Sequence, residues 1–181
     1  MSDDATGFVG NIPENYDRGL GPIIFADYAE HTARLVAGYA PSRVLETGAG
    51  TGIVTRRLRD VLPPTTRLIA TDLNPPMLEV ARKKFRPDEP VEFQHAYAMA
   101  LPFADASFDA VSEFATLHHA ANPTAVVTEI LRVLDRQYGA VVEGDLQVAC
   151  LVQQPGPRSA CRRRRSLCRT AGSRASRLSG R

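Results

Sequence analysis

Three glycines spaced two apart, Gly48, Gly50 and Gly52, stand at the centre of the stretch VLETGAGTGIV, residues 44–54. Glycine has no Cβ, so its backbone can turn with a positive φ and another group can lie directly against it. An apolar segment at 42–48 predicts a buried strand before the glycines, and the pattern over 51–61 predicts a helix after them. A strand, a glycine turn and a helix in this order are typical of the ligand-binding edge of an open parallel sheet.

The rest of the chain continues the alternation of strands and helices. Asn74 and Asn122 each precede a proline, which is a typical helix start. We predict further strands over 67–72, 91–95, 108–114 and 139–146, and helices over 26–39, 75–85 and 124–134. This order predicts an α/β fold, a Rossmann-like doubly wound parallel sheet with helices on both faces.

Asp72 closes the second predicted strand, twenty-odd residues after the first glycine. A carboxylate at this place can accept both hydroxyl hydrogens of a ribose, which suggests a nucleoside ligand rather than a plain tight turn. A nicotinamide-binding loop needs Gly or Ala where this chain has Ile53, and the charge of Glu46 would repel a pyrophosphate. An NAD-dependent oxidoreductase is therefore disfavoured, and a ligand with a positive group and no phosphate fits better.

Four stretches together resemble the successive motifs of class I S-adenosylmethionine-dependent methyltransferases: VLETGAGTG, ATDLNPPML, ALPFADASFDAV and EILRVL. The branch of small-molecule enzymes that includes the ubiquinone and menaquinone methylases is the most similar in style. The resemblance covers roughly residues 8–146 and includes the opening segment GFVGNIPENYDRGLGPIIFADYA. It implies transfer of a methyl group from S-adenosylmethionine to a small-molecule acceptor.

The resemblance also implies which residues would bind the cofactor. Glu46 and the glycine loop would face its methionine part, Asp72 its ribose, and a few apolar residues its adenine. Leu73 and Met77 have an alternative role as core residues, and Tyr16, which would help to cover the site, as an ordinary packed tyrosine. The full set is Tyr16, Glu46, Gly48, Ala49, Gly50, Gly52, Asp72, Leu73, Met77, Ala98 and Met99.

The chain departs from the family pattern at three places. Tyr97 stands where the family usually has an acidic residue that binds the adenine amino group, and Tyr138 replaces a turn glycine. The family also continues past the fifth strand with a helix and two strands. Here an arginine-rich segment follows instead, so we expect a sheet that lacks those last two strands.

The charge distribution separates this segment from the rest. Residues 155–181 hold 9 arginines and no acidic residue, whereas residues 1–154 hold 13 basic and 20 acidic residues. We therefore predict a lead-in or cap over 1–25, a cofactor-binding domain over 26–146 and a disordered tail over 147–181. The tail favours a truncated or frameshifted product that binds cofactor without catalysis, or misfolds, as the alternative to an active enzyme. A nucleic-acid-binding tail is a weaker interpretation.

The sequence does not identify a catalytic residue, the acceptor or the oligomeric state. His118 and His119 are the candidate bases, although a histidine pair at a strand end more often makes local hydrogen bonds. The three cysteines lack the spacing of a zinc site, so we predict no metal. No long apolar run is present, so we expect no membrane association and a soluble, cytoplasmic protein.

Overall fold

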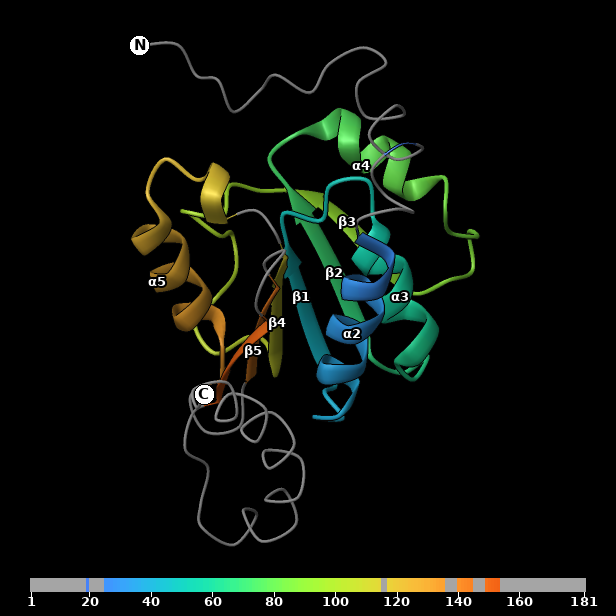
Figure 1. Cartoon of the computed structure of the whole chain (residues 1–181), viewed down its shortest axis with the longest axis horizontal. Helices are drawn as coiled ribbons and strands as arrows, with labels where there is room; N and C mark the ends of the chain where they lie inside the picture. The colour runs from blue at the N-terminus through green and yellow to red at the C-terminus, as the bar shows by residue number, and fades with distance from the viewer. Residues whose placement is uncertain (1–18, 20–24, 115–116, 136–139, 145–148, 154–181) are drawn as a thin grey trace, which may run out of the picture.

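The predicted alternation of strands and helices is present in the computed structural model, which describes residues 19, 25–114, 117–135, 140–144 and 149–153 (Figure 1). The helices are α2 (Ala26–Ala37), α3 (Ile53–Val61), α4 (Pro75–Arg82), the short 3₁₀ helix η3 (Leu117–His119) and α5 (Pro123–Val133). The strands are β1 (Arg43–Thr47), β2 (Arg67–Asp72), β3 (Val91–His95), β4 (Ala110–Phe114), β5 (Ala140–Gly144) and β6 (Ala149–Gln153).

The strands form one six-stranded sheet in the order β3-β2-β1-β4-β5-β6. Strands β1 to β5 are paired in parallel, with Glu46 of β1 in register with Ala70 of β2 and Ser112 of β4. The chain leaves β1 toward β2 and later returns to the other side of β1 with β4. The order therefore reverses between β1 and β4, and ligands bind at such a reversal, beyond the carboxyl ends of the strands.

Helices cover both faces of the sheet, which confirms the predicted doubly wound fold (Figure 1). On one face, Val44 of β1 packs with Val36 of α2 and Leu58 of α3. On the other face, Leu45 of β1 packs with Ile130 of α5. Adjacent residues of β1 point to opposite faces, so a run of apolar residues is needed where both faces are buried.

The helix boundaries agree with the predicted ones to within three residues, and two of the helices begin in different ways. Asn122 caps α5 as predicted, since its side chain accepts a hydrogen bond from the backbone of Ala125 at 3.1 Å. Asn74 precedes α4 but its side chain makes no capping hydrogen bond. Instead, its backbone N–H donates to Asp72 Oδ1 at 2.7 Å, so the start of α4 is tied to the end of β2.

Strand β6 lies beyond residue 146, where we predicted the end of the folded domain. It runs antiparallel to β5, with Val141 opposite Val152 and Gly144 opposite Ala149. An antiparallel neighbour needs only a short connection, so the few residues after β5 suffice for it. The structure corrects the predicted boundary and gives β5 a partner on both sides. The arginine-rich segment from 155 lies outside the described residues.

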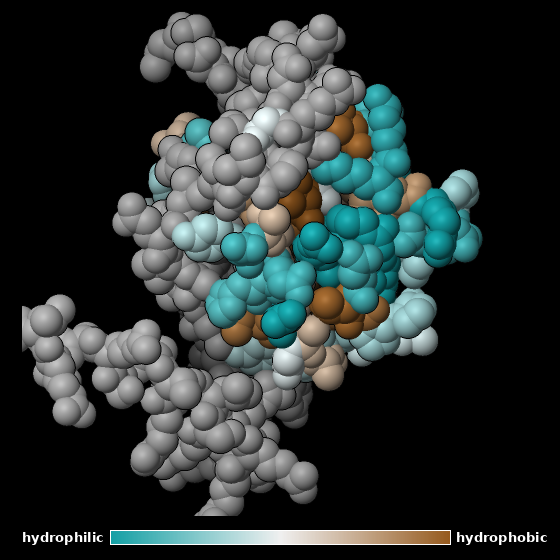
Figure 2. Space-filling model, turned by 45° about the vertical axis from the view of Figure 1, so that its right-hand side comes forward, coloured by the Kyte–Doolittle hydropathy of each residue, from teal (hydrophilic) through white to brown (hydrophobic). Residues whose placement is uncertain are grey.

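The described surface is mostly hydrophilic on the side that Figure 2 presents, with small hydrophobic areas between the hydrophilic residues. In the part of the chain that the structure describes, the exposed large hydrophobic residues lie on separate elements: Tyr28 on α2, Val61 on α3, Tyr97 after β3 and Val127 on α5. Such scattered residues are normal on a protein surface and do not form a docking site. None of the helices among the described residues is long and apolar enough to span a membrane.

Candidate functional site

The glycine loop after β1 has left-handed backbone at all three glycines, with φ of 63° at Gly48, 54° at Gly50 and 77° at Gly52. Residues with a side chain rarely adopt these angles, which explains the alternation of glycines in the sequence. The backbone N–H of Ala49 donates to the carbonyl of Thr71 on β2 at 2.9 Å. The loop is thus fixed to the neighbouring strand at the carboxyl edge of the sheet.

Gly50 and Gly52 meet different surroundings. A Cβ at Gly50 would have no heavy atom within 4 Å, whereas a Cβ at Gly52 would lie 2.8 Å from the Cβ of Ala81 on α4. Gly50 therefore borders open space, and Gly52 allows α3 to begin directly against α4. We predicted that the whole loop faces the cofactor. The contact of Gly52 with Ala81 gives that residue a packing role, and the buried side chain of Ala49 packs with Ala70 and Leu78.

Asp72 joins the glycine loop to the start of α4. Its Oδ2 accepts a hydrogen bond from the backbone N–H of Gly50 at 2.8 Å, and its Oδ1 accepts one from Asn74 at 2.7 Å. The residue is 8% exposed. Oδ1 also accepts from the side-chain amide of Asn74 at 3.4 Å, whereas Oδ2 retains the capacity to accept a further hydrogen bond. The geometry is compatible with a ribose at this edge.

Glu46 lies buried in β1, one residue before its end, and is 2% exposed. Among the described residues, its Oε2 has no hydrogen-bond partner, and the same is true of the buried hydroxyls of Thr51 and Ser112. Burial is the main cause that raises the pKa of Glu46 to about 8, with Thr55 offsetting part of the effect and Asp72 adding to it. Buried polar atoms are almost always paired, so these groups suit a polar ligand such as the amino-acid end of S-adenosylmethionine.

The residues predicted to contact the adenine lie around the ends of β2 and β3. Leu73, Ala98 and Met99 are half-buried, and Met77 is buried in α4. The backbone N–H of Ala96 donates to the carbonyl of Asp72 at 3.1 Å, so the turn after β3 lies beside the predicted ribose site. Tyr97 is 43% exposed, and its hydroxyl lies 3.8 Å from the sulfur of Met99. No carboxylate therefore occupies this position of the turn.

Two residues of α5 hold the loop that follows this turn, and sequence reasoning missed them. Arg132 donates to the carbonyls of Leu101 and Phe103 at 2.9 and 2.8 Å. Glu129 accepts from the backbone N–H of Leu101 at 2.8 Å and also binds Arg132. Its hydrogen bond with Arg132 is the main cause that lowers the pKa of Glu129. The three-residue spacing of Glu129 and Arg132 was a signal for a helical ion pair, but not for its contact with the loop.

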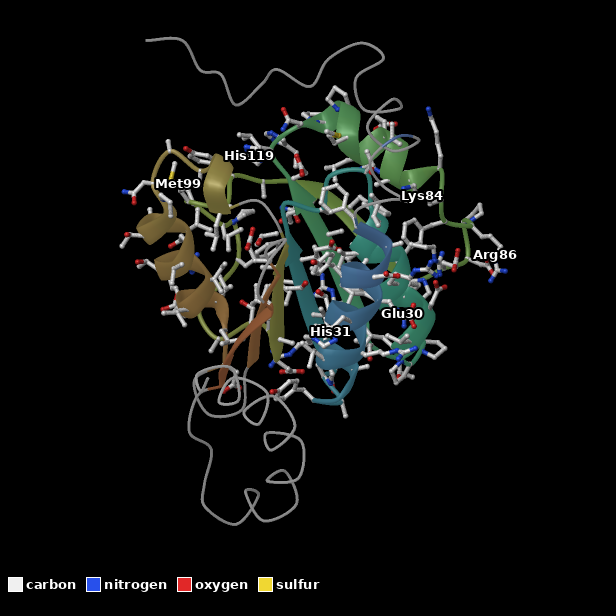
Figure 3. The ribbon with its side chains drawn as sticks, in the orientation of Figure 1. Glu30, His31, Lys84, Arg86, Met99 and His119 are labelled. Atoms are coloured by element: carbon white, nitrogen blue, oxygen red, sulfur yellow. The ribbon has the colours of Figure 1, made fainter. Side chains whose placement is uncertain are left out.

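The structure describes the remaining candidate site residues only in part. The backbone of η3 carries His118 and His119, and the His119 side chain is exposed at the same end of the molecule as Met99 (Figure 3). Tyr16, Tyr138 and the side chain of His118 lie outside the part of the chain that the structure describes. Within that part, no group of three or more His, Cys, Asp and Glu residues could hold a metal ion.

Comparison with known families agrees with this site. The family model described as "Methyltransferase domain" matches residues 45–141, which is more than half of the chain. The chain belongs to this methyltransferase family. The match begins just before the glycine loop and ends in β5, so it includes the carboxyl edges of β1, β2 and β4.

Individual methyltransferases are also similar to this chain in sequence. A demethylmenaquinone methyltransferase from Clavibacter sepedonicus is 41% identical over 103 residues, which are 57% of this chain and 41% of the relative. A ubiquinone/menaquinone biosynthesis C-methyltransferase, UbiE, from Hahella chejuensis is 34% identical over 98 residues, or 52% of this chain and 39% of the relative. The chain thus spans about two fifths of the length of these curated relatives.

The solved structures include a Methanococcus maripaludis protein that is provisionally assigned to the S-adenosyl-L-methionine-dependent methyltransferases. Its TM-score is 0.68 with 18% identity, and the match covers 80% of this chain and 67% of that chain. At this identity the similarity shows the fold alone. Together with the family match, it confirms the predicted methyltransferase fold and S-adenosylmethionine as the cofactor of the family.

Proposed function

We propose that this methyltransferase transfers the methyl group of S-adenosylmethionine to a small, quinone-like acceptor. The observation that carries the proposal is the junction at Asp72, whose two carboxylate oxygens accept hydrogen bonds from the glycine loop and from the start of α4. A ribose bound there would extend toward Glu46 on one side and toward the turn at Ala98 and Met99 on the other. Asp72, Glu46 and the turn at Ala98 and Met99 are also the positions that the family resemblance implies.

S-adenosylmethionine supplies an electrophilic methyl group on a sulfonium centre. In this proposal Asp72 orients the ribose, Glu46 neutralises the amino group, and the backbone of Gly48 to Gly50 lies against the methionine part. Leu73 and Met77 pack on the adenine face, and Ala98 and Met99 border its edge. These residues position the reactants for an in-line displacement and exclude water, which is the main contribution of a protein to such a step.

The acceptor side is lined by apolar groups. Half-buried side chains of Leu117 and Ala120 pack against the core cluster under α5, next to Ala98 and Met99 at the adenine edge. They come from the turn after β3 and from η3 after β4, at the carboxyl edge of the sheet. An apolar wall beside the methyl donor suits a planar hydrophobic acceptor, such as the demethylated quinones named for the relatives. Tyr16 would cover the site, and a catalytic base is not assigned.

Binding of S-adenosylhomocysteine, the product form of the cofactor, tests the first half of the proposal. We expect the full chain to bind it in calorimetry, and Asp72→Asn to weaken binding by roughly 10- to 100-fold, because a charge-assisted hydrogen bond is lost while the side-chain shape is kept. The control Glu92→Gln removes an exposed ion pair with Arg67 far from the site and should bind normally. Equal affinities of all three proteins would reject the assignment of Asp72.

Methyl transfer to a demethylated quinol tests the second half. A radiolabelled methyl group from S-adenosylmethionine should appear in the extracted quinol and be absent with Asp72→Asn. If the chain binds S-adenosylhomocysteine but labels neither a quinol nor a simple phenol, the non-catalytic alternative holds. If it binds NAD in preference to S-adenosylhomocysteine, the oxidoreductase interpretation returns.

A further inference from the structure

Glu46 is a buried carboxyl group with one oxygen that has no hydrogen-bond partner. Its register neighbour on β4 is Ser112, which is fully buried and also has an unpartnered hydroxyl. Thr55, in the first turn of α3 and fully buried, lies on the same face and favours the ionised form of Glu46 by hydrogen bonding. An unpaired buried polar atom costs roughly 1–3 kcal/mol, so the two together, on Glu46 and Ser112, point to a missing polar partner.

The charge of Asp72 beside Glu46 favours a cationic partner over an anionic one. Asp72 is the charged group that acts on it, and its negative charge disfavours a second carboxylate nearby. The buried face of α2 consists of Ala29, Thr32, Ala33 and Val36, none of which is charged. Arg59 of α3 donates instead to the carbonyl groups of Leu62, Pro63, Thr66 and Pro90 at the far end of that helix.

We propose that Glu46 releases a proton when the α-ammonium group of the cofactor binds beside it. This inference rests on the proposed function and concerns the regulation of the same site. The O–H bond of the Glu46 carboxyl group breaks, its electron pair stays on the carboxylate, and the proton passes to solvent. The ammonium group keeps its own protons and donates hydrogen bonds to the carboxylate. Beside Glu46, the positive charge of the ammonium group thus takes the place of the proton that leaves.

The exchange makes cofactor affinity depend on pH. Burial raises the pKa of Glu46 to about 8, so the free protein holds the proton at neutral pH. A nearby ammonium group favours the ionised carboxylate and lowers this pKa in the complex. Binding then becomes tighter as pH rises, approaching tenfold per pH unit while the free form is protonated and the bound form is not.

Calorimetric titration of the full chain with S-adenosylhomocysteine measures the released proton. The titration is run at about pH 6 to 7.5, below the titration of the ligand's own amino group, in two buffers that differ in ionisation enthalpy. We expect the apparent heat to differ between the buffers by an amount that corresponds to nearly one proton released per ligand. The dissociation constant should fall by about 10- to 30-fold across this range.

Methylthioadenosine is the matched probe, because it retains the adenosine and the thioether but lacks the amino-acid end. It should bind without releasing a proton. Glu46→Gln, which keeps the size of the side chain, should bind S-adenosylhomocysteine more weakly and with no heat difference between buffers. In the wild-type infrared difference spectrum, S-adenosylhomocysteine should remove a protonated-carboxyl band that Glu46→Gln lacks, so the test does not depend on the stability of the variant.

Two results would overturn the inference while leaving the proposed function intact. One is tight binding of S-adenosylhomocysteine to the wild-type chain with the same heat in both buffers. The other is proton release of equal size with methylthioadenosine, which would assign the proton to the ribose or adenine side. Failure of the wild-type chain to bind either ligand would reject the proposed function and this inference together.

Discussion

Two loops that follow strands of the sheet are held in different ways. The glycine loop after β1 is fixed by its own backbone, with three left-handed glycines and hydrogen bonds to Thr71 and Asp72 of β2. The loop at 101–105 after β3 is fixed from outside, by the side chains of Glu129 and Arg132 on α5. The residues of the first loop match the family pattern. The second loop comes after the turn at Tyr97, a residue that departs from the family pattern.

The difference shows where this fold permits variation. A loop fixed by backbone angles cannot change residue type without changing shape, so it suits the part of the site that every family member needs. A loop fixed by distant side chains keeps its shape while its own residues vary. We therefore expect substitutions in the glycine loop to affect folding and cofactor binding strongly, and substitutions after β3 to have smaller effects.

Gly52→Ala and Gly50→Ala make the same change at two left-handed glycines and give the sharpest contrast. Gly52→Ala adds backbone strain and a contact of 2.8 Å with Ala81, so we expect it to lower the free energy of unfolding by roughly 3–5 kcal/mol. Gly50→Ala meets no atom within 4 Å, so we expect a loss of about 1–2 kcal/mol. Urea denaturation measures both. Equal losses would show that backbone angle alone decides the glycine pattern.

Glu46→Gln tests the buried carboxyl group through the pH dependence of stability. The pKa of Glu46 in the folded chain is about 8, above its ordinary value of 4.5. Its contribution to stability is therefore fully present below about pH 4.5 and is lost as pH rises through about 8. We expect Glu46→Gln to gain on the order of 2–4 kcal/mol relative to wild type between pH 5 and pH 8. A constant difference between the two proteins across this range would contradict the raised pKa.

Arg132→Met should loosen the loop at 101–105, because the carbonyls of Leu101 and Phe103 lose their donor. We expect a loss of roughly 1–2 kcal/mol in the free energy of unfolding and faster amide exchange at Leu101. Arg67→Met is the control, since it breaks an exposed ion pair with Glu92 and should cost less than about 0.5 kcal/mol. If both variants lose the same stability, the side chains of α5 do not hold this loop.

Tyr97→Asp has the smallest expected effect and asks whether the second loop can accept the family's acidic residue. We expect S-adenosylhomocysteine to bind about three- to tenfold tighter, because a carboxylate would accept a hydrogen bond from the adenine amino group. The analogue with inosine in place of adenosine should show no gain. Tyr97→Phe, which removes only the hydroxyl near Met99, should bind like wild type. A gain for both analogues would place the adenine elsewhere.

The glycine loop and Asp72 could be predicted from the sequence because local chemistry determines them. Positive φ selects glycine, and a parallel sheet brings the ends of β1 and β2 together whatever else the chain does. The sequence also separated the strands from the helices, since their hydrophobic periods differ. These are short-range properties, and the structure agrees with them to within a few residues at the helix ends.

Other features depended on contacts that the sequence does not encode locally. Arg132 binds carbonyl groups about thirty residues earlier in the chain, and an ion pair on a helix gives no hint of such a target. Strand β6 was predicted as part of the tail, because an antiparallel edge strand of five residues carries little pattern of its own. The contact between Gly52 and Ala81 likewise appears only when α3 and α4 are packed.

That last contact links two positions that are far apart in the sequence. The start of α3 and the end of α4 share room for one methyl group, which Ala81 now occupies. The two positions are sterically coupled. A combinatorial library that varied either position alone would discard most of its members. Combining Gly52→Ala with Ala81→Gly would keep the total side-chain volume. Anyone who redesigns the cofactor pocket of this protein therefore has room beside Gly50 but must still satisfy its left-handed backbone, and must treat residues 52 and 81 as one position.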